Sequence, residues 1–337
     1  VLTSPVVDAE LAAQGVLFEQ AVSTTSWTVP AHKSLLTGLP DELHGGGTLA
    51  PLPPSRPHLA EAFRAAGWRT AGFFSGPNLH PWYGFGRGFE RYVDCSNAPV
   101  TEDSGAFDLE TPEGRQRMRD VQRASHQGVT SPKLVDALDA WLGELDADEP
   151  FFAFVHMWDV HFDYAAPPED DVFFPDYDGW VDGSNYVELD RAEERDEQDV
   201  QRLVSLYDAE VRFTDRHIGR MLELLRAAGR LDGTLVVFVS DHGEEFFEHG
   251  RFGHNRTLFE EVVHIPLVLR YPRGLPQGLR VDDLASLADV APTILDLCRL
   301  QGSPVIWGRS LLPALTSDLE ARDAPLDLRL FRDEDAP

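Results

Sequence analysis

The sequence predicts an α/β fold in which helices cover both faces of a mostly parallel, mixed β-sheet. The first observation is that short apolar runs bounded by polar turns recur along the chain, at residues 68–74, 151–157, 234–240 and 265–270. Apolar runs of this length are typical of strands that are buried on both faces. The second observation is that amphipathic helical patterns lie between these runs. Alternation of strands and helices along a chain favours a sheet with helices on both sides.

Three helices are expected from the spacing of apolar residues and from the residues at their ends. Residues 56–67 end on a glycine, which commonly terminates a helix. Residues 131–146 begin with Ser131 as the expected N-cap and Pro132 at the first helical position. The longest helix is expected over about 199–229, where large apolar residues recur on one face.

Two polar and acidic stretches, 96–130 and 162–198, interrupt this alternation. Loops of this length in a compact domain are typically functional lids or insertions without a direct role, and both interpretations stay open here. Aromatic residues of the second stretch can stack on a sugar or aryl group or pin the loop to the domain, and pinning is favoured. Residues 1–315 therefore form one domain with two insertions, and we expect the acidic residues 316–337 to begin a truncated or small C-terminal subdomain.

The chain is strongly acidic, with 57 acidic and 29 basic residues and a formal net charge of −28. A field of this sign repels nucleic acid and anionic membrane surfaces, so neither is an expected partner. No apolar run in the sequence reaches the roughly 20 residues that a transmembrane helix needs. The same field repels an anionic substrate, so an anion site in this protein would need a metal ion or local cations.

Polar side chains follow two of the expected strands. Asp241 and His242 come directly after one apolar run, and His156, Asp159 and His161 lie at the exit of another. In open α/β sheets, ligands bind beyond the carboxyl ends of the strands. A single Asp-His pair is more often a turn cap beside a surface histidine, but histidines at two strand ends favour convergence on an anion or a metal ion.

Thr28 lies in a third polar segment, where it precedes Pro30 and an expected short helix. The structural interpretation is a threonine N-cap with proline in the first turn. The functional interpretation uses the same geometry, because a hydroxyl at a helix N-terminus lies in a positive field that favours the alkoxide and binds oxyanions. A metal ion in contact with that oxygen would activate it further.

Together these segments resemble the sulfatases of the alkaline-phosphatase superfamily. "TVPAHKSLLTG" (28–38) is similar to the family signature in which a nucleophile is followed by proline, arginine and "LLTG". "SDHGEEFFEHGRFGHNRTLFEEVVHIPLVLR" (240–270) is similar to the second signature, in which a strand ends on two metal ligands. Residues 4–23 resemble the helix that leads to the nucleophile, and residues 288–315 resemble the segment after the second signature. The resemblance covers nearly the whole chain in order.

The resemblance implies a catalytic role for five residues. Thr28 would be the nucleophile and also a ligand of one divalent metal ion. Asp241 and His242 would be the other metal ligands in this chain. His161 and His254 would hold substrate oxygens or assist the leaving group.

His32 is a further expected catalytic residue, and other residues near these motifs have less direct expected roles. His32 stands at the position of the family's arginine and can still donate to an anion, although without a bidentate fork. His156 is expected to contact the substrate. Lys33 is a second candidate substrate contact, with a solvated helix residue as the alternative. For Glu245 and His249 we expect solvation in a loop.

Two departures from the family pattern shape the functional expectation. The family's first strand carries paired aspartates of the metal site and would lie upstream of "SPVVDAELAAQG" (4–15). We therefore expect this sequence to be truncated at its N-terminus, with Asp8 a helix residue and no substitute for those aspartates. The sheet would then lack a central strand, which exposes apolar surface and backbone groups.

The second departure is the threonine itself. Sulfatases use a cysteine or serine that is oxidised to formylglycine, and threonine cannot give that aldehyde because its β-carbon carries a methyl group. No formylglycine is therefore expected. Thr28 would act as an alkoxide in an in-line displacement, which favours a phosphodiester or phosphonate ester over a sulfate ester. Mixed carboxylate, hydroxyl and imidazole ligands suit Ca²⁺, Mg²⁺, Mn²⁺ or Zn²⁺.

The leading functional hypothesis is a metal-dependent hydrolase of phosphate, phosphonate or sulfate esters that acts on a small-molecule or glycan ester. A phosphoglycerol-type transferase is one alternative. A second alternative is a catalytically inactive fold that serves as a binding or assembly module. A purely structural domain leaves the histidines unexplained.

Overall fold

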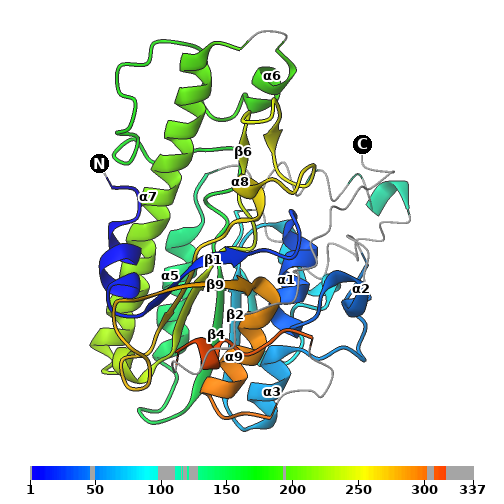
Figure 1. Ribbon diagram of the computed structural model, residues 1–337, viewed down its shortest axis with the longest axis vertical. Helices are drawn as coiled ribbons and strands as arrows, with labels where there is room; N and C mark the ends of the chain where they lie inside the picture. The colour runs from blue at the N-terminus through cyan, green and yellow to red at the C-terminus, as the bar shows by residue number, and fades with distance from the viewer. Residues whose placement is uncertain are drawn as a thin grey trace.

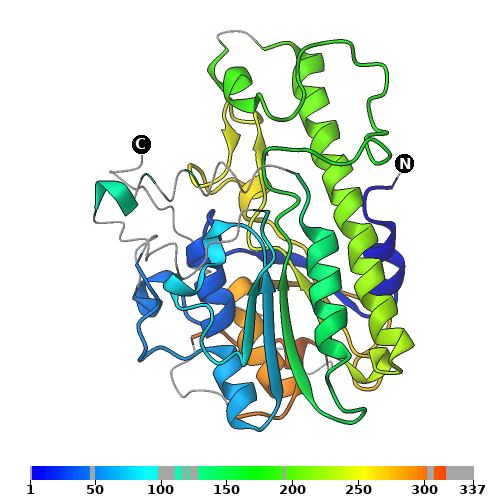
Figure 2. The ribbon, with the colours of Figure 1, turned by 180° about the vertical axis from the view of Figure 1, so that it is seen from behind.

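The computed structural model describes residues 2–45, 50–97, 111–114, 116, 120, 128–192, 195–301 and 307–315. Helices lie on both faces of the strands, which Figures 1 and 2 show from opposite sides. The strands are β1 (Val16–Val22), β2 (Arg69–Phe74), β3 (Arg91–Asp94), β4 (Phe151–His156), β5 (Val236–Val239), β6 (Glu245–Phe246), β7 (Phe252–Gly253), β8 (Leu267–Arg270) and β9 (Leu279–Ser286). The α-helices are α1 (Thr28–Thr37), α2 (Asp41–His44), α3 (Leu59–Ala65), α5 (Ser131–Leu142), α6 (Tyr186–Arg191), α7 (Glu197–Ala227), α8 (Glu260–Val263), α9 (Val290–Leu297) and α10 (Leu312–Leu315).

The strands of the core form two parts. One part has the order β5-β8-β1-β9, in which β1 is parallel to β9 and β8 is antiparallel to both of its neighbours. The other part has the order β3-β2-β4 and is parallel throughout. The predicted fold class, a mixed sheet between helices, is confirmed, and the four apolar runs form β2, β4, β5 and β8.

The expectation of a helix through residues 4–23 is wrong in its second half. A short π-helix covers Val7–Ala12, and the chain then forms β1, which pairs with strands on both sides. Glu19 and Gln20 hide this strand in the sequence because they break its apolar run. The register of β1 against β9 shifts between Phe18 and Gln20, so an irregular step accommodates the polar pair.

The core lies on both sides of the strands. One face of β4 and β5 packs through Phe152, Phe154, Val237 and Val239 against a cluster that includes residues of α1, α3 and α9. Val236 and Phe238 of β5 pack instead against Leu222 and Leu225 of α7, together with Val7 and Leu11 of the first helical turn. Ala153 and Val155 of β4 pack against Leu134, Leu138 and Trp141 of α5. Alternate residues of each strand therefore serve opposite helical layers, as the continuous apolar runs predicted.

A cavity of about 1580 Å³ lies between β4 and β5. Among the residues that the structure describes, β4 pairs only with β2, and β5 pairs only with β8. The two strands run in the same direction, because His156 at the end of β4 and Asp241 just after β5 both contact His32. Every residue of β4 and β5 is only half-buried, whereas all of β8 and nearly all of β2 are buried.

Helix α5 begins differently from the sequence expectation. Thr130, and not Ser131, is its N-cap residue, with Pro132 in the first turn. The missing side-chain cap is supplied by Asp159, whose buried carboxylate accepts hydrogen bonds from the backbone amides of Thr130 and Ser131 and from the Thr130 hydroxyl, at 2.6–2.7 Å. Asp159 therefore holds α5 against the exit of β4 instead of joining the histidines as a ligand.

The second insertion packs onto the amino-terminal half of α7, beyond the carboxyl end of β4 (Figure 1). Tyr164 and Val181 are buried there in a cluster with Leu203 and Leu206 of α7. Tyr177 and Trp180 both donate hydrogen bonds to the carboxylate of Asp199 on α7, which supports pinning of the loop. Most of the first insertion, 96–130, and all of the acidic segment 316–337 lie outside the described residues.

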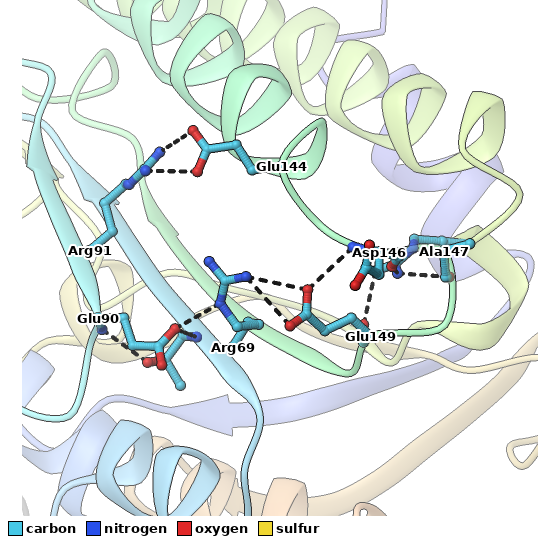
Figure 3. A network of polar contacts seen from close by, with 9 residues as sticks. Arg69, Glu90, Arg91, Glu144, Asp146, Ala147 and Glu149 are labelled. Atoms are coloured by element: carbon cyan, nitrogen blue, oxygen red, sulfur yellow. Dashed lines mark hydrogen bonds and ion pairs between the residues drawn. The ribbon is translucent and has the colours of Figure 1, made fainter.

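A polar network ties the opposite end of the sheet together (Figure 3). Arg69 at the start of β2 pairs with Glu90 and with Glu149, and Arg91 of β3 forms a bidentate pair with Glu144 at the end of α5. These groups are largely solvent-accessible, so each pair contributes little to the stability of the fold. The described residues contain no helix that is long and apolar enough to cross a membrane.

Helix α1 is buried along its whole length, and this corrects the two expected roles of Lys33. Its side chain is fully buried, so it is not a solvated helix residue. Its Nζ atom donates a hydrogen bond of 2.7 Å to the carbonyl of Ala50, and Lys33 does not line the cavity that contains the other predicted site residues. Burial lowers the pKa of Lys33 to about 8, although the nearby Asp41 carboxylate opposes this shift.

The buried lysine predicts a pH-dependent stability. The folded-state pKa of about 8 lies below the ordinary value of 10.5, so the unfolded chain binds more protons between these two values. The contribution of Lys33 to the free energy of unfolding should therefore rise with pH across this window, by about 3 kcal/mol in total. In urea titrations at pH 7.5 and 10.5, wild type should gain this amount relative to Lys33→Met. The exposed Lys133→Met is the matched control, and equal pH dependence of Lys33→Met and wild type would contradict the assignment.

Candidate active site

The predicted site residues come from four separate elements that meet at one end of the strands. Thr28 and His32 lie one turn apart on α1, His156 ends β4, and Asp241 lies in the loop just after β5. His161, His242 and His254 complete the set, and all seven line the same cavity. The meeting follows from chain direction, because strands that run in the same direction present their carboxyl ends at one edge.

Thr28, Asp241 and His242 form the centre of this arrangement. The Oγ1 atom of Thr28 lies 3.2 Å from Nε2 of His242. The same Nε2 atom lies 3.4 Å from Oδ2 of Asp241. Thr28 is the first residue of α1 and not its N-cap, so its hydroxyl lies at the positive end of the helix without being used for capping.

Backbone contacts hold His242 in place and select its tautomer. The Nδ1 atom lies 2.8 Å from the carbonyl oxygen of Gly243, so Nδ1 carries the proton and donates it to that carbonyl. Nε2 then has a free lone pair directed at Thr28. A side chain at Gly243 would overlap the backbone of Glu261, because a β-carbon there would lie only 2.2 Å from the Glu261 carbonyl oxygen. Glycine therefore permits this close backbone approach.

His32 links the helix to the strand ends. Its Nδ1 atom lies 2.9 Å from the backbone carbonyl of Thr28 and 3.4 Å from Oδ2 of Asp241. Its ring packs edge-on against that of His156, with 4.9 Å between ring centroids. The Nδ1 atom of His156 in turn lies 3.0 Å from the carbonyl of Ser75. His32 and His156 therefore form one wall of the site beside Asp241.

His254 and His161 form the opposite wall. The rings of His254 and His242 lie 4.3 Å apart between centroids, and those of His254 and His161 lie 5.1 Å apart. His161 stacks on Trp158 at 3.8 Å, which fixes the plane of its ring. The amide of Asn255 donates to the carbonyl of Ser26, so the segment that carries His254 is tied to the segment before Thr28.

The sequence reasoning missed Glu244. Its buried carboxylate lies 2.9 Å from Nδ1 of His254 and accepts a hydrogen bond of 3.2 Å from the hydroxyl of Tyr164. Glu244 follows His242 by two residues, but its partners are 10 and 80 residues away in the sequence. The only sequence signal was a carboxylate in a histidine-rich loop, which gives no indication of burial.

The expected solvation is wrong for Glu245. Its side chain is buried and accepts hydrogen bonds from the amide of His249 and the hydroxyl of Thr257. Glu245 therefore connects β6 to the segments before and after β7. His249 is exposed, as expected, and it stacks on Phe259 and pairs with Glu261. Neither residue is among those that line the cavity.

Burial and neighbouring charges give the groups of the site different protonation preferences. Burial lowers the pKa of His156 to about 3, and it also lowers that of His242 despite the attraction of Asp241. Burial alone would raise the pKa of Asp241, but His242 and His32 outweigh it and lower the value to about 2. For His254 the Glu244 carboxylate outweighs burial and raises the pKa. The site therefore holds an ionised carboxylate, neutral imidazoles and one imidazole that keeps its proton more readily.

The donor atoms around Thr28 fit part of a metal site. Ligands that bind a metal at about 2.1 Å lie roughly 3.0–3.4 Å from one another in octahedral or tetrahedral geometry. The distances from His242 Nε2 to Thr28 Oγ1 and to Asp241 Oδ2, 3.2 and 3.4 Å, match this spacing. Within the described part of the chain, however, no group of three or more histidine, cysteine, aspartate or glutamate side chains is arranged as a metal site. The three donors are thus a compatible but small ligand set.

Comparison with known proteins places these observations in a family. Residues 2–300 match the family model described as Sulfatase. An N-acetylglucosamine-6-O-sulfatase of Bacteroides thetaiotaomicron is 36% identical over 118 residues, which cover 35% of this chain and 21% of that protein. Arylsulfatase K of Danio rerio is 34% identical over 120 residues, covering 36% of this chain and 23% of that protein. The aligned region thus spans less than a quarter of either relative.

Solved structures show the same fold over nearly the whole chain. The phosphonate monoester hydrolase of Agrobacterium radiobacter superposes with a TM-score of 0.71 at 24% identity, covering 97% of this chain and 74% of that one. A structure described as BT4656 in complex with its substrate D-glucosamine-2-N,6-O-disulfate has a TM-score of 0.72 at 20% identity, covering 97% of this chain and 77% of that one. With the family match over residues 2–300, this shows that the chain belongs to the sulfatase family.

Proposed function

We propose that this chain is the catalytic domain of a metal-dependent ester hydrolase in which Thr28 is the nucleophile. The single observation that carries the proposal is the contact of 3.2 Å between Thr28 Oγ1 and His242 Nε2, at the N-terminus of α1 and beside Asp241. A hydroxyl in the field of a helix end, beside a carboxylate and an unprotonated imidazole nitrogen that would share a divalent cation with it, is primed to lose its proton to solvent.

The substrate class we favour is a phosphodiester or a phosphonate monoester, ahead of a sulfate ester. The nucleophile supports this choice, since an alkoxide of Thr28 forms a phosphorus–oxygen bond that water can later cleave. The fold likeness to phosphonate monoester hydrolases of Agrobacterium radiobacter and Silicibacter pomeroyi is consistent with it. Likeness to proteins named as sulfatases keeps sulfate esters as the second class to test.

The residues of the chain have distinct parts in the proposed reaction. Thr28 Oγ1 attacks phosphorus in line as the bond from phosphorus to the leaving oxygen breaks. The Glu244 carboxylate at Nδ1 stabilises the protonated form of His254, which donates its Nε2 proton to the leaving oxygen. His161 and His32 lie on opposite sides of the non-bridging oxygens. Each already directs Nδ1 at a backbone carbonyl, so a hydrogen bond from either ring to the substrate requires a proton on Nε2. Water, which gives a proton to the now neutral His254, then attacks phosphorus, and the bond from phosphorus to Thr28 Oγ1 breaks to release the acid product and restore the threonine.

We propose that a divalent metal ion binds between Thr28, Asp241 and His242. It would supply Lewis-acid stabilisation of the attacking oxygen and of the charge that develops on the phosphoryl group. The need for such a charge follows from composition, because a chain with a net charge of −28 otherwise repels an anionic ester.

Replacement of the nucleophile tests the central step. Thr28→Ala in an active preparation should lower turnover of an aryl phosphonate monoester by at least about 100-fold, because no other group replaces the attacking oxygen. Thr28→Ser keeps a hydroxyl at the same helix position and should retain most of the turnover. Equal turnover of Thr28→Ala and wild type would remove Thr28 from the mechanism. The same assay with an aryl sulfate measures the preference between the two ester classes.

Metal content tests the proposed cofactor. Elemental analysis of the purified protein should find one divalent ion per chain, and His242→Ala should lose it together with activity. His249→Ala is the matched control, because His249 lies in the same segment and does not line the cavity. Activity that persists in a metal-free preparation would contradict the proposal. A stable, metal-free and inactive protein would instead support a binding or assembly module.

A further inference from the structure

Helix α7 contributes one stripe of residues to the wall of the cavity, from Tyr207 through Val211 and Ile218 to Leu225. Positions with this spacing lie on one face of a helix. Leu225 packs in one cluster with Val236, at the start of β5. Tyr207 lies about 27 Å farther toward the amino end of the helix, at a rise of about 1.5 Å per residue. Tyr207 is therefore at the end of the stripe that reaches the imidazoles.

Two ring contacts hold Tyr207 beside Glu244. The ring of Tyr207 lies edge-on to those of Tyr164 and Phe246, with 5.6 and 5.1 Å between centroids. The hydroxyl of Tyr164 donates to one oxygen of Glu244, and the other oxygen of Glu244 lies 2.9 Å from Nδ1 of His254. Tyr207 thus lies next to the residues that hold His254 in place, without taking part in their hydrogen bonds.

The two tyrosines use their hydroxyl groups differently. Tyr164 is 1% exposed, and its hydroxyl is bonded to Glu244. Tyr207 is half-buried and lines the cavity, and its hydroxyl has no hydrogen-bond partner among the residues that the structure describes. A tyrosine hydroxyl that is largely buried usually has such a partner. Burial, followed by the Glu244 carboxylate, raises the pKa of Tyr207, so the hydroxyl keeps its proton and can donate it.

The imidazoles of the site offer few protons to an anion. The Nδ1 atoms of His32, His156 and His242 each lie 2.8–3.0 Å from a backbone carbonyl, and Nδ1 of His161 lies 2.7 Å from another. A carbonyl only accepts, so in each neutral ring the proton is on Nδ1 and Nε2 has a lone pair. Such a lone pair suits a metal ion and repels an anionic oxygen. A bound phosphoryl group therefore needs a donor from another side chain.

We propose that Tyr207 is a further catalytic residue, whose hydroxyl donates a hydrogen bond to a non-bridging oxygen of the bound ester. This inference rests on the proposed function and extends it to a residue of α7. A neutral hydroxyl stabilises the charge that grows on the phosphoryl oxygens without the desolvation cost of a buried cation. No covalent bond forms to Tyr207, and its hydroxyl keeps its proton throughout the reaction.

The substitution Tyr207→Phe tests this role, because it removes one oxygen and keeps the ring contacts with Tyr164 and Phe246. Tyr271→Phe is the matched control. Tyr271 lines the same cavity and directly follows β8 at the opposite end of the strands, and its hydroxyl also has no partner in the described part of the chain. Because neither hydroxyl is bonded in the fold, both variants should keep a Tm within about 2 °C of wild type.

With an aryl phosphonate monoester as substrate, Tyr207→Phe should lower kcat/KM by at least about tenfold, the low end of the loss expected for one donor to an oxyanion. Tyr271→Phe should stay within about twofold of wild type. Equal kcat/KM in these two variants, with Thr28→Ala inactive, would overturn the role of Tyr207 and leave the proposed function intact. Full activity of Thr28→Ala would overturn both.

The pH dependence of kcat/KM separates direct contact from an indirect effect through His254. The alkaline limb of this profile reports the loss of the proton that His254 donates. Tyr207→Phe should lower the profile at every pH without moving this limb. Tyr164→Phe, which removes a hydrogen bond to Glu244, should move it. A limb that moves in Tyr207→Phe as far as in Tyr164→Phe would make Tyr207 a positioning residue for His254 and overturn the proposed contact with the substrate.

Discussion

The site depends on one constraint, which is that β4, β5 and the segment before α1 all end at the same edge of the strands. The contact between Thr28 and His242 joins residues 214 positions apart, and neither segment determines it alone. It requires β8 to reverse direction, so that β5 and β1 lie on either side of it and run parallel. Asp241 and His156, which lie at the ends of two different strands, then both contact His32.

The charge at this edge of the strands differs from what the number of histidines alone would suggest. Five histidines gather in an acidic protein, yet burial lowers the pKa of His156 and of His242, so these two rings contribute little positive charge. His254 is the exception because a buried carboxylate lies against it and raises its pKa. The field that an anionic ester meets is thus set by the helix end at Thr28, by His254 and by whatever cation the three oxygen and nitrogen donors bind.

Much of this arrangement could be predicted from sequence, and the rest could not for identifiable reasons. The sequence indicated Thr28, Asp241 and His242 because Thr28 begins a helix and the other two closely follow a strand. The ends of such elements can be recognised from the neighbouring residues alone. Strand β1 was missed because Glu19 and Gln20 sit at a register shift that no local pattern reveals. The burial of Lys33 could not be predicted, because every residue of α1 is buried and the segments that cover the helix are distant in the sequence. Glu244 was missed because its burial is created by Tyr164, from a different segment.

The hydrogen bond from Tyr164 to Glu244 has a consequence for how this enzyme family member can diversify. Tyr164 begins the insertion that packs on α7, and Glu244 holds the imidazole of His254. The insertion is therefore connected through Glu244 to a group proposed to transfer a proton. A change of the insertion that displaces Tyr164 should therefore also displace Glu244 and shift the ring of His254.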